Sequence, residues 1–285
     1  MLDIRHASTA LLFSTVRVEC TSPDGSTCVG TAFFFEFRGI EKHVLPLLVT
    51  NRHVVEGSVY AEFLVHLACK SGDKRYDQGD PPSGDSIRIR VDTDNNWILH
   101  PTEDLCALPI ASLLDAADTD ANRIFYRPLH DGILPDEREL RMMAAVESVL
   151  MIGYPTGLWD RTNNLPLIRQ GITATPPIVD YEGTARGIVD IACFPGSSGS
   201  PIVVAHEGAF LRGRSLVTTK APYVRLIGIL SSGPLFDTEG SVEVVEAPAT
   251  RVPIARLGIP VHLGYYVKAK ALNYFREYAM TLSSL

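Results

Sequence analysis

Apolar and polar residues alternate with a period of two through most of this chain. The alternating segments are rich in β-branched and aromatic residues, and clusters of Gly, Pro, Asn and Asp separate them. Helical spacing of apolar residues is confined to short stretches. The pattern therefore predicts an all-β protein built from short strands and turns.

The first group of strands lies in residues 1–112, which we interpret as one β-barrel domain. Its strands are expected at Leu12–Cys20, Cys28–Phe37, Leu45–Thr50, Val59–Leu67, Ile87–Val91, Trp97–Leu99 and Leu105–Ile110. The sequence Ser-Pro-Asp-Gly at 22–25 has the composition of a turn. It predicts a hairpin across which Cys20 and Cys28 could face each other.

A second strand-rich region runs from Ser148–Gly153 to about Val267. Between the two regions, residues 113–147 are acid-rich and partly helical, and we interpret them as a linker. Lys268–Met280 carries apolar residues at helical spacing and predicts a helix packed on the second barrel. We expect two six-stranded antiparallel Greek-key barrels, with residues 148–285 forming the second barrel and its terminal helix.

Composition narrows the classes of function. The 285 residues are 46% apolar and 21% charged, which suits a soluble globular protein with one large or two small domains. The net charge of −7 and the lack of basic runs argue against nucleic acid or an anionic membrane as a partner. No apolar run is long enough to span a bilayer, and an acid at Asp3 is untypical of a signal peptide, so we expect a cytoplasmic protein.

The five cysteines are odd in number and contain no CxxC pair, which favours reduced thiols over a disulfide framework or a zinc site. The histidines other than His53 show no spacing typical of metal ligands. We therefore expect neither a metal nor an organic cofactor.

Candidate chemistry centres on Ser198, which lies in the glycine-framed sequence Phe-Pro-Gly-Ser-Ser-Gly-Ser-Pro at 194–201. A serine hydroxyl is a poor nucleophile at neutral pH and needs a base. His53 can accept the proton, and Asp104 can orient the imidazole and stabilise its cation. The order His, Asp, Ser is that of chymotrypsin, and a cleft between two barrels would bring these distant residues together.

The glycines around Ser198 have a role of their own. A tight turn with an unhindered backbone lets the amides of Gly196 and Ser198 point together at the carbonyl oxygen under attack. We expect these two amides to form the oxyanion hole. Pro195 would stiffen the approach to the turn.

Four motifs resemble those of trypsin-like proteases, and among them the bacterial HtrA/Deg group and related peptidase domains. They are Val-Thr-Asn-Arg-His-Val-Val at 49–55, Asp-Leu-Cys-Ala at 104–107, Ile-Gly-Tyr-Pro-Thr-Gly-Leu at 152–158, and Asp-Ile-Ala at 190–192 followed by Pro-Gly-Ser-Ser-Gly at 195–199. The resemblance implies a serine endopeptidase that acts on a protein or peptide through a covalent acyl-enzyme.

The chain departs from that pattern in two ways. Ser197 replaces the aspartate that pairs with a new N-terminus in trypsin-like zymogens, so activation by that salt bridge is not available. HtrA-like proteins carry a PDZ domain after the protease, whereas this sequence continues for one further helix. We therefore expect either one dedicated protein substrate or activation by a protein partner.

The resemblance also implies where substrate binds. The strand ending in Ser231, Ser232 and Gly233 would pair with the substrate backbone. Ala192, Cys193 and Gly264 would complete the pocket for the side chain before the cut, the P1 residue. Ala192 replaces the aspartate of trypsin, and Leu230 replaces the histidine of glutamyl endopeptidases. The expected P1 residue is therefore small or medium-sized and apolar.

Several interpretations stay open at this point. Arg169 is either linked to active-site ordering or a solvent-facing strand residue. Trp159 and Asp160 are either contacts for an activator or an ordinary turn, and Cys193 is either a redox-sensitive thiol or an inert wall. The rival functions are a catalytically silent scaffold that keeps the barrels and an esterase that uses the same residues.

Overall fold

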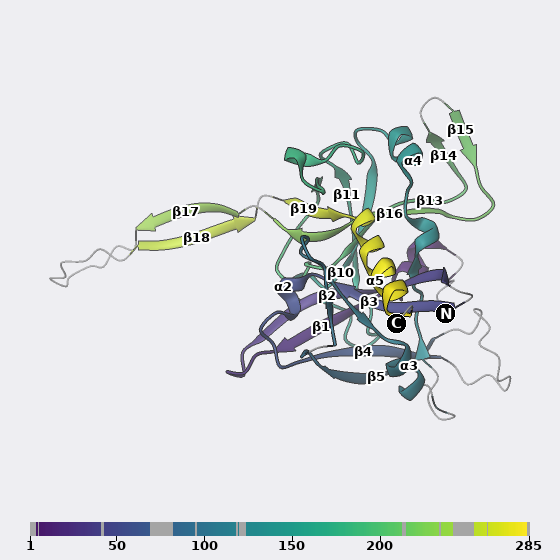
Figure 1. Ribbon diagram of the computed structural model, residues 1–285. Helices are drawn as coiled ribbons and strands as arrows, with labels where there is room; N and C mark the ends of the chain where they lie inside the picture. Colours follow the sequence, from purple (N-terminus) through teal and green to yellow (C-terminus); the bar gives the residue numbers. More distant parts are fainter. Residues whose placement is uncertain are drawn as a thin grey trace.

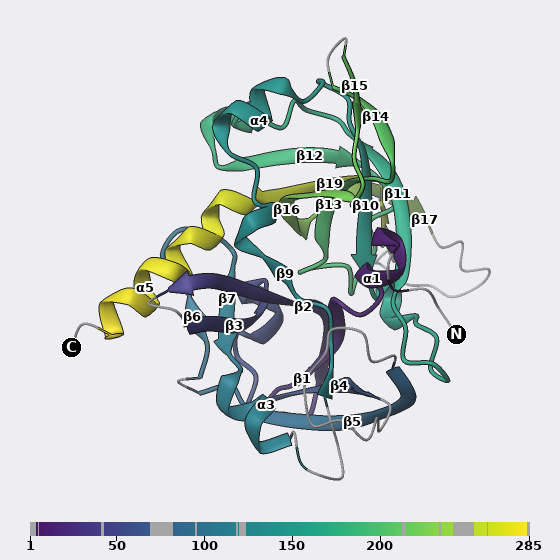
Figure 2. The ribbon, with the colours of Figure 1, turned by 90° about the vertical axis from the view of Figure 1, so that its right-hand side faces the viewer.

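The chain folds into two β units with a helix along their junction. The computed structural model describes residue 4 and residues 6–40, 43–68, 82–94, 96–117, 119, 124–212, 215–233, 235–241, 254–260 and 262–283. Figures 1 and 2 show the first unit below the second, with the C-terminal helix α5 (Asn273–Ser283) running diagonally beside both. The prediction of an all-β chain with a C-terminal helix is confirmed.

The first unit is one sheet. Its main strands are β1 (Thr15–Thr21), β2 (Thr27–Ile40), β3 (His43–Thr50), β4 (Tyr60–Ala68), β5 (Pro82–Asp92), β6 (Ile98–Leu99) and β7 (Cys106–Pro109). They pair in the order β5-β4-β1-β2-β3-β7-β6, and β8 (Ile124–Phe125) and β9 (Leu129–His130) join β4 and β2. The sheet has nine strands, because β8 and β9 join the seven strands expected from the sequence, whereas the barrel was expected to have six. Both additional strands are only two residues long, too short to produce a periodic signal.

This sheet curls around a core of its own. Val91 of β5 and Leu108 of β7 belong to one buried cluster, although their strands lie at opposite ends of the pairing order. Strand β2 has two buried faces because its side chains alternate between two cores. Phe34 points into the sheet's own core, whereas Phe33 and Phe35 point toward the second unit.

The second unit is a closed barrel of six strands, as predicted, and its strands pair in the order β10-β11-β12-β19-β16-β13. These strands are β10 (Ser148–Gly153), β11 (Leu167–Thr173), β12 (Arg186–Asp190), β13 (Pro201–His206), β16 (Tyr223–Ser232) and β19 (Leu263–Lys268). Its interior contains Met151, Ile191, Cys193, Leu230 and Tyr266, among other buried residues.

A third buried cluster joins the two units. It combines Phe35 and Val49 of the first sheet with Val203 of the barrel and Phe275 of α5. The helix was expected to pack on the second barrel alone. Its Tyr274 ring also lies 4.8 Å from that of His100, centroid to centroid, in the first unit. The helix therefore helps to fix the two units against each other.

The remaining elements are short helices, 3₁₀ turns and two hairpins outside the two main sheets. The helices and 3₁₀ turns are α1 (Ala7–Leu11), α2 (Arg52–Val55), α3 (Ala111–Ala117), η1 (Asp131–Ile133), α4 (Glu137–Met142), η2 (Pro155–Gly157), η3 (Tyr181–Gly183) and η4 (Ala269–Leu272). Two hairpins are β14 (Ala209–Arg212) with β15 (Ser215–Thr218) and β17 (Leu235–Ser241) with β18 (Ile254–Pro260). The second hairpin extends away from the body (Figure 1).

Two further expectations concern the start of the chain and the linker. The first strand begins at Thr15 rather than Leu12, because residues 7–11 form α1. The linker contains β8 and β9, which bind it to the first sheet.

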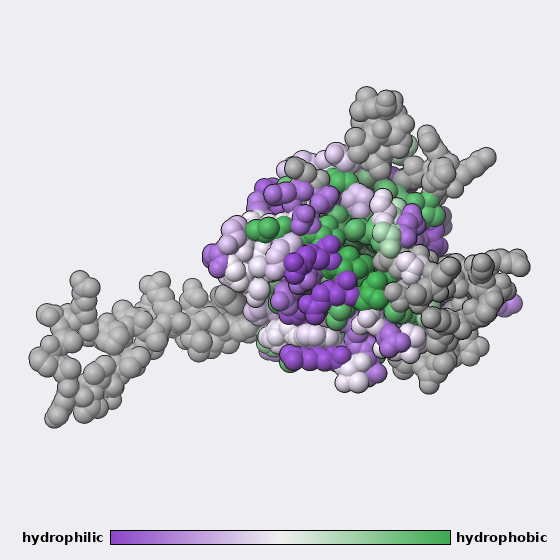
Figure 3. Space-filling view, turned by 90° about the horizontal axis from the view of Figure 1, so that it is seen from below, coloured by the Kyte–Doolittle hydropathy of each residue, from purple (hydrophilic) through white to green (hydrophobic). Residues whose placement is uncertain are grey.

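Among the described residues, no helix combines the length and apolar character needed to cross a membrane. The face seen from below carries both hydrophilic and hydrophobic residues (Figure 3).

The cysteine pair of the first hairpin lies as proposed. Cys20 and Cys28 are directly opposite each other in the β1–β2 register. Four cysteines are free thiols, and Cys69 lies outside the described residues.

Candidate active site

His53 and Asp104 meet at the edge of the first unit. His53 lies in the short helix α2, directly after β3, and Asp104 comes just before β7, the strand paired with β3. The His53 Nδ1 and Asp104 Oδ2 atoms are 2.7 Å apart. The backbone N–H of His53 donates to the other carboxylate oxygen at 3.1 Å. The side-chain amide of Asn51 fixes the backbone by donating to the Asp104 carbonyl at 2.7 Å.

The Asp104 carboxylate accepts hydrogen bonds from other residues of the chain. Besides His53, the hydroxyl of Ser231 donates to its Oδ2 at 2.7 Å. Burial alone would raise the pKa of Asp104, but the hydrogen bonds from His53 and Ser231 outweigh it and the pKa lies below its usual value. The carboxylate is therefore ionised at neutral pH and can hold the His53 ring in one orientation.

A β-turn shapes the backbone before Ser198. The N–H of Ser197 donates to the carbonyl of Phe194 at 3.0 Å, which closes a four-residue turn. Pro195 and Gly196 are its central residues, and Gly196 has a φ of +86°. This pattern is that of a type II turn, which requires a positive φ at its third residue and favours proline at its second. The Pro-Gly pair thus explains why the chain turns here.

The turn also fixes where the Gly196 amide points. The carbonyl of Pro195 accepts a hydrogen bond from the Thr156 N–H of η2. In a trans peptide the N–H points opposite to the preceding carbonyl, so the Gly196 N–H points away from Thr156. Among the described residues, no hydrogen bond engages the amides of Gly196 or Ser198. These two donors are therefore available.

A single buried threonine of the first unit connects to this turn. The Thr31 hydroxyl of β2 donates to the Gly196 carbonyl at 2.9 Å and accepts from the Tyr154 N–H at 3.2 Å. The Thr31 N–H donates to the Ser198 carbonyl at 2.8 Å. Thr31 thus holds the serine loop of one unit against the other. Sequence reasoning did not identify Thr31, because the contact depends on how the two units pack.

Ser198 lies next to Ser231 in the observed conformation. Its hydroxyl donates to the Ser231 carbonyl at 3.3 Å. The hydroxyl of Ser231 in turn reaches Asp104, so a continuous set of contacts joins Ser198, Ser231, Asp104 and His53. No direct hydrogen bond links Ser198 to His53 among the described residues. Ser231 was expected only in substrate binding, and its contact with Asp104 was missed.

The other residues predicted to bind substrate also come together. Strand β16 pairs with β13 as far as Ile229, and Leu230 still accepts from the Gly199 N–H and donates to the Ser200 carbonyl, so the free edge begins only at Ser231 and Ser232. A Cβ atom on Gly233 would lie 3.6 Å from that of Cys193. One on Gly264 would lie 2.5 Å from the Cys193 sulfur, so only glycine leaves room there. Ala192 and Cys193 therefore form one wall opposite Gly233 and Gly264.

Cys193 behaves as a buried wall residue rather than a reactive one. Burial raises the pKa of its thiol to about 11, although nearby Arg169 partly offsets the shift. A thiol of this kind is neutral at pH 7, and the reactive form of cysteine is the thiolate. The inert interpretation is favoured.

Arg169 does not face solvent. It lies opposite Met151 in the β10–β11 register, and Met151 belongs to the barrel interior. Its Nη1 donates to the Ala192 carbonyl. The solvent-facing interpretation is wrong, because the face that Arg169 occupies depends on the register of β10 and β11, which the sequence pattern leaves open.

Trp159 and Asp160 form an ordinary turn. The Asp160 carboxylate accepts hydrogen bonds from the N–H groups of Thr162 and Asn163, both at 3.0 Å. The Trp159 ring lies under the guanidinium groups of Arg17 and Arg161. These contacts hold the loop from within the chain, and a role in binding an activator stays a prediction.

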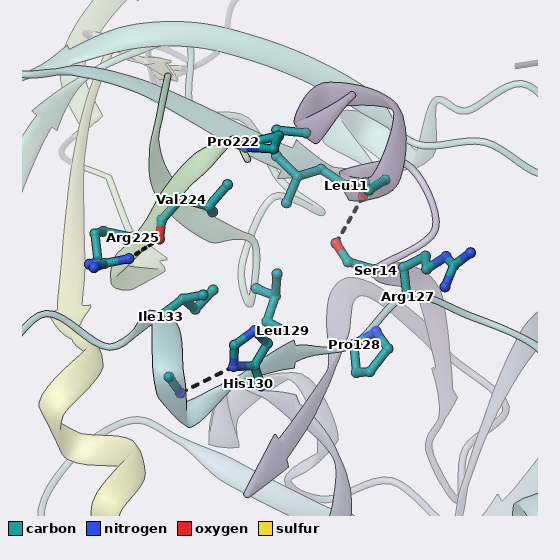
Figure 4. A pocket seen from close by; sticks show the side chains of 13 residues that line it. Leu11, Ser14, Arg127, Pro128, Leu129, His130, Ile133, Pro222, Val224 and Arg225 are labelled. Atoms are coloured by element: carbon teal, nitrogen blue, oxygen red, sulfur yellow. Dashed lines mark hydrogen bonds between the residues drawn. The ribbon is translucent and has the colours of Figure 1, made fainter. Parts of the chain in front are cut away.

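A separate cavity of about 440 Å³ lies away from these residues (Figure 4). Its lining is apolar at Leu11, Leu129, Ile133 and Val224, and one nitrogen of His130 accepts from the Gly132 N–H.

Within the described ranges, no group of three or more His, Cys, Asp or Glu side chains could hold a metal ion.

The curled first sheet, the closed six-stranded barrel and the C-terminal helix are consistent with the trypsin-like fold expected from the sequence. No family model and no curated sequence matches it. Among solved structures it is similar to one described as GrC and to HL collagenase, each with a TM-score of 0.47 over 95% of both chains, at 13% and 11% identity. A scabies mite inactivated protease paralogue has a TM-score of 0.39 at 11% identity over 97% of this chain and 96% of its own.

Proposed function

We propose that the protein is a serine endopeptidase in which Ser198 is the nucleophile, His53 the general base and then acid, and Asp104 the residue that orients His53. One observation carries the proposal: Asp104 accepts hydrogen bonds from both His53 and Ser231, and Ser231 also contacts the Ser198 hydroxyl. Residues from both units converge at this point. Ordinary packing gives no reason for a half-exposed His53 to be held by an ionised carboxylate.

Catalysis would begin with a rotation of the Ser198 side chain from the Ser231 carbonyl toward His53. As the Ser198 oxygen attacks the scissile carbonyl carbon, the free ring nitrogen of His53 takes its proton. The His53 cation forms beside Asp104, whose charge stabilises it. This step needs no movement of Asp104, because the carboxylate is already held in place.

The negative oxygen that forms would bind the amides of Gly196 and Ser198. Donors that are preoriented in this way stabilise the transition state more than the ground state. His53 then gives its proton to the leaving amine, and the C–N bond breaks to leave an acyl group on Ser198. Water, deprotonated by His53, hydrolyses this ester and regenerates the hydroxyl of Ser198.

The contacts around Gly196 bear on regulation. Thr31 and Thr156 hold the turn from within the chain, where a zymogen-type enzyme would use an aspartate at position 197. This favours a turn that is formed before any partner binds. Restriction to a small set of protein substrates, activation by a partner and a cytoplasmic location stay predictions.

Labelling with a fluorophosphonate probe tests the nucleophile. Wild-type protein should be labelled at Ser198, and Ser198→Ala should not be labelled at all. Ser14→Ala is the matched control, because it removes a serine hydroxyl outside the site that bonds only the Leu11 carbonyl. No labelling of the wild type under any condition would favour the silent scaffold instead. Matched peptide and ester substrates would then separate a peptidase from an esterase.

A further inference from the structure

Arg169 is a charged group without a counter-charge. Its Nη1 donates to the Ala192 carbonyl, but its Nε and Nη2 atoms are buried and have no hydrogen-bond partner among the described residues. No described carboxylate forms an ion pair with it. The thiol of Cys193, its nearest ionisable neighbour, is held neutral by burial, which raises its pKa to about 11.

Such an arrangement is costly for the folded chain. A guanidinium carries five N–H donors and stays protonated in proteins. Burying it without a carboxylate lowers stability, since no opposite charge among the described residues compensates the loss of hydration. Burial also lowers the pKa of Arg169 from its usual value. A buried polar group left unsatisfied by its own chain needs an explanation, and a ligand that binds to it is one.

Arg169 is directed at the region predicted to receive the substrate side chain. Because it lies opposite Met151, it projects into the barrel rather than toward solvent. There it contacts Ala192, directly before Cys193, and Cys193 packs against the positions of Gly233 and Gly264. Gly233 lies two residues after Ser231, which contacts Ser198. Contacts and short stretches of chain therefore connect the nucleophile to the guanidinium.

We propose that Arg169 determines substrate specificity by binding the carboxylate of an acidic P1 residue, glutamate or aspartate. This inference rests on the proposed peptidase function and deepens it. The two free N–H donors of Arg169 match the two oxygens of a carboxylate. Ala192 contributes by its carbonyl, which holds the guanidinium in place through the third nitrogen.

This specificity differs from the one expected from sequence. Ala192 and Leu230 occupy the positions where trypsin and the glutamyl endopeptidases carry their charged or polar selectivity residues, which suggested an apolar P1 residue. Arg169 comes from β11, a strand far from the serine loop in sequence. In this proposal the charge that selects the P1 residue comes from Arg169 on β11 rather than from position 192 or 230.

The test uses pairs of fluorogenic peptides that differ only in P1 glutamate or glutamine, which have nearly the same shape. Wild type should cleave the glutamate peptide with a kcat/KM about 100-fold higher or more, since a site built to bind a polar group rejects the analogue without its charge. Arg169→Met should bring the two values within about 10-fold of each other. Arg138→Met, on the exposed face of α4, makes the same charge change and should keep the preference.

Two readouts separate a specificity role from a structural one. Fluorophosphonate labelling has no P1 residue, so its rate should be the same in Arg169→Met and wild type. The melting temperature of Arg169→Met should rise by about 2–4 °C without substrate, since an uncompensated buried charge has been removed. Slower labelling together with a lower melting temperature would mean that Arg169 only supports the fold, and would overturn the inference.

A binding measurement keeps the inference testable if the chain proves inactive. Ser198→Ala is titrated calorimetrically with peptide acids ending in glutamate or glutamine. Tighter binding of the glutamate peptide, lost in the Ser198→Ala, Arg169→Met double variant, supports the inference even if peptidase function fails. Equal binding of the two peptides, or cleavage of peptides with apolar P1 residues by a well-labelled wild type, overturns the inference and leaves the peptidase proposal intact.

Discussion

Asp104 and Arg169 are two partly buried charges, one in each β unit, and the chain treats them in opposite ways. Asp104 accepts hydrogen bonds from the backbone and ring of His53 and from the Ser231 hydroxyl. Arg169 donates only to the Ala192 carbonyl, and two of its nitrogens have no described partner. A satisfied charge positions the chain's own residues, whereas an unsatisfied one is available to a ligand.

The same contrast holds for the backbone of the serine loop. The carbonyls of Pro195, Gly196 and Ser198 all have hydrogen-bond partners, from Thr156 and Thr31. The amides of Gly196 and Ser198 have none among the described residues. The carbonyls therefore fix the loop, and the amides face the space where substrate would bind.

Removing the charge of Asp104, which hydrogen bonds from the chain satisfy, should cause the largest loss of activity. Asp104→Asn keeps the size of the side chain but removes the charge that orients His53 and stabilises its cation. We expect kcat to fall by about 10⁴-fold with little change in KM. Steady-state kinetics on a peptide substrate would measure both. A fall of less than about 10-fold would mean that Asp104 does not orient the base.

Displacing the free amide of Gly196 should cause the second largest loss of activity. Gly196→Ala places a Cβ atom 2.5 Å from the Tyr154 carbonyl oxygen, at a positive φ that alanine disfavours. The turn must change, and the Gly196 donor is lost. We expect kcat to fall by about 100- to 1000-fold. Gly25→Ala is the control, because Gly25 also has a positive φ but lies in an open hairpin turn. Equal activity of Gly196→Ala and wild type would refute the oxyanion role.

Loosening the contact between the two regions should have a smaller effect. Thr31→Val removes the hydroxyl that joins β2 to the Gly196 carbonyl and keeps the shape of the side chain. The loss of about one net hydrogen bond predicts a fall in kcat of roughly 10-fold. Thr31→Ser retains the hydroxyl and should recover most of the activity. If valine and serine gave the same kcat, the contact would have no role in positioning the loop.

The smallest effect is expected on stability, when Asp104 is protonated at low pH. Its pKa is lower in the folded chain than its usual value, so the unfolded chain binds this proton more readily. The stability that Asp104 contributes is therefore present at neutral pH and is lost as the pH falls below about 4, through its folded pKa. Melting temperatures of wild type and Asp104→Asn should differ at pH 7, and the difference should shrink as the pH falls below about 4. A constant difference across this range would contradict the assignment.

The sequence predicted the parts of this site that depend on local pattern. His53, Asp104 and Ser198 were found because each lies in a recognisable motif, and Pro195 with Gly196 predicted the turn from composition. Alternation of apolar and polar residues predicted the strands of the second unit for the same reason.

What the sequence missed depends on register and on packing between distant segments. Thr31 and Gly196 are 165 residues apart and meet only because the two units pack together. The direction of Arg169 depends on a register in which a shift of one residue would turn it outward. Neither contact leaves a periodic signal, so neither could be predicted from a single sequence.

Cleavage of a denatured protein by the purified chain tests the central claim most directly. Unfolded casein is incubated with wild type or Ser198→Ala, and new N-termini are identified by mass spectrometry. We predict that wild type alone generates new termini and that the residue before each cut is acidic, a result that would also overturn the expectation of one dedicated substrate or an activating partner. Identical termini from both proteins, or none from either, would contradict the account that Ser198 is the nucleophile of a peptidase.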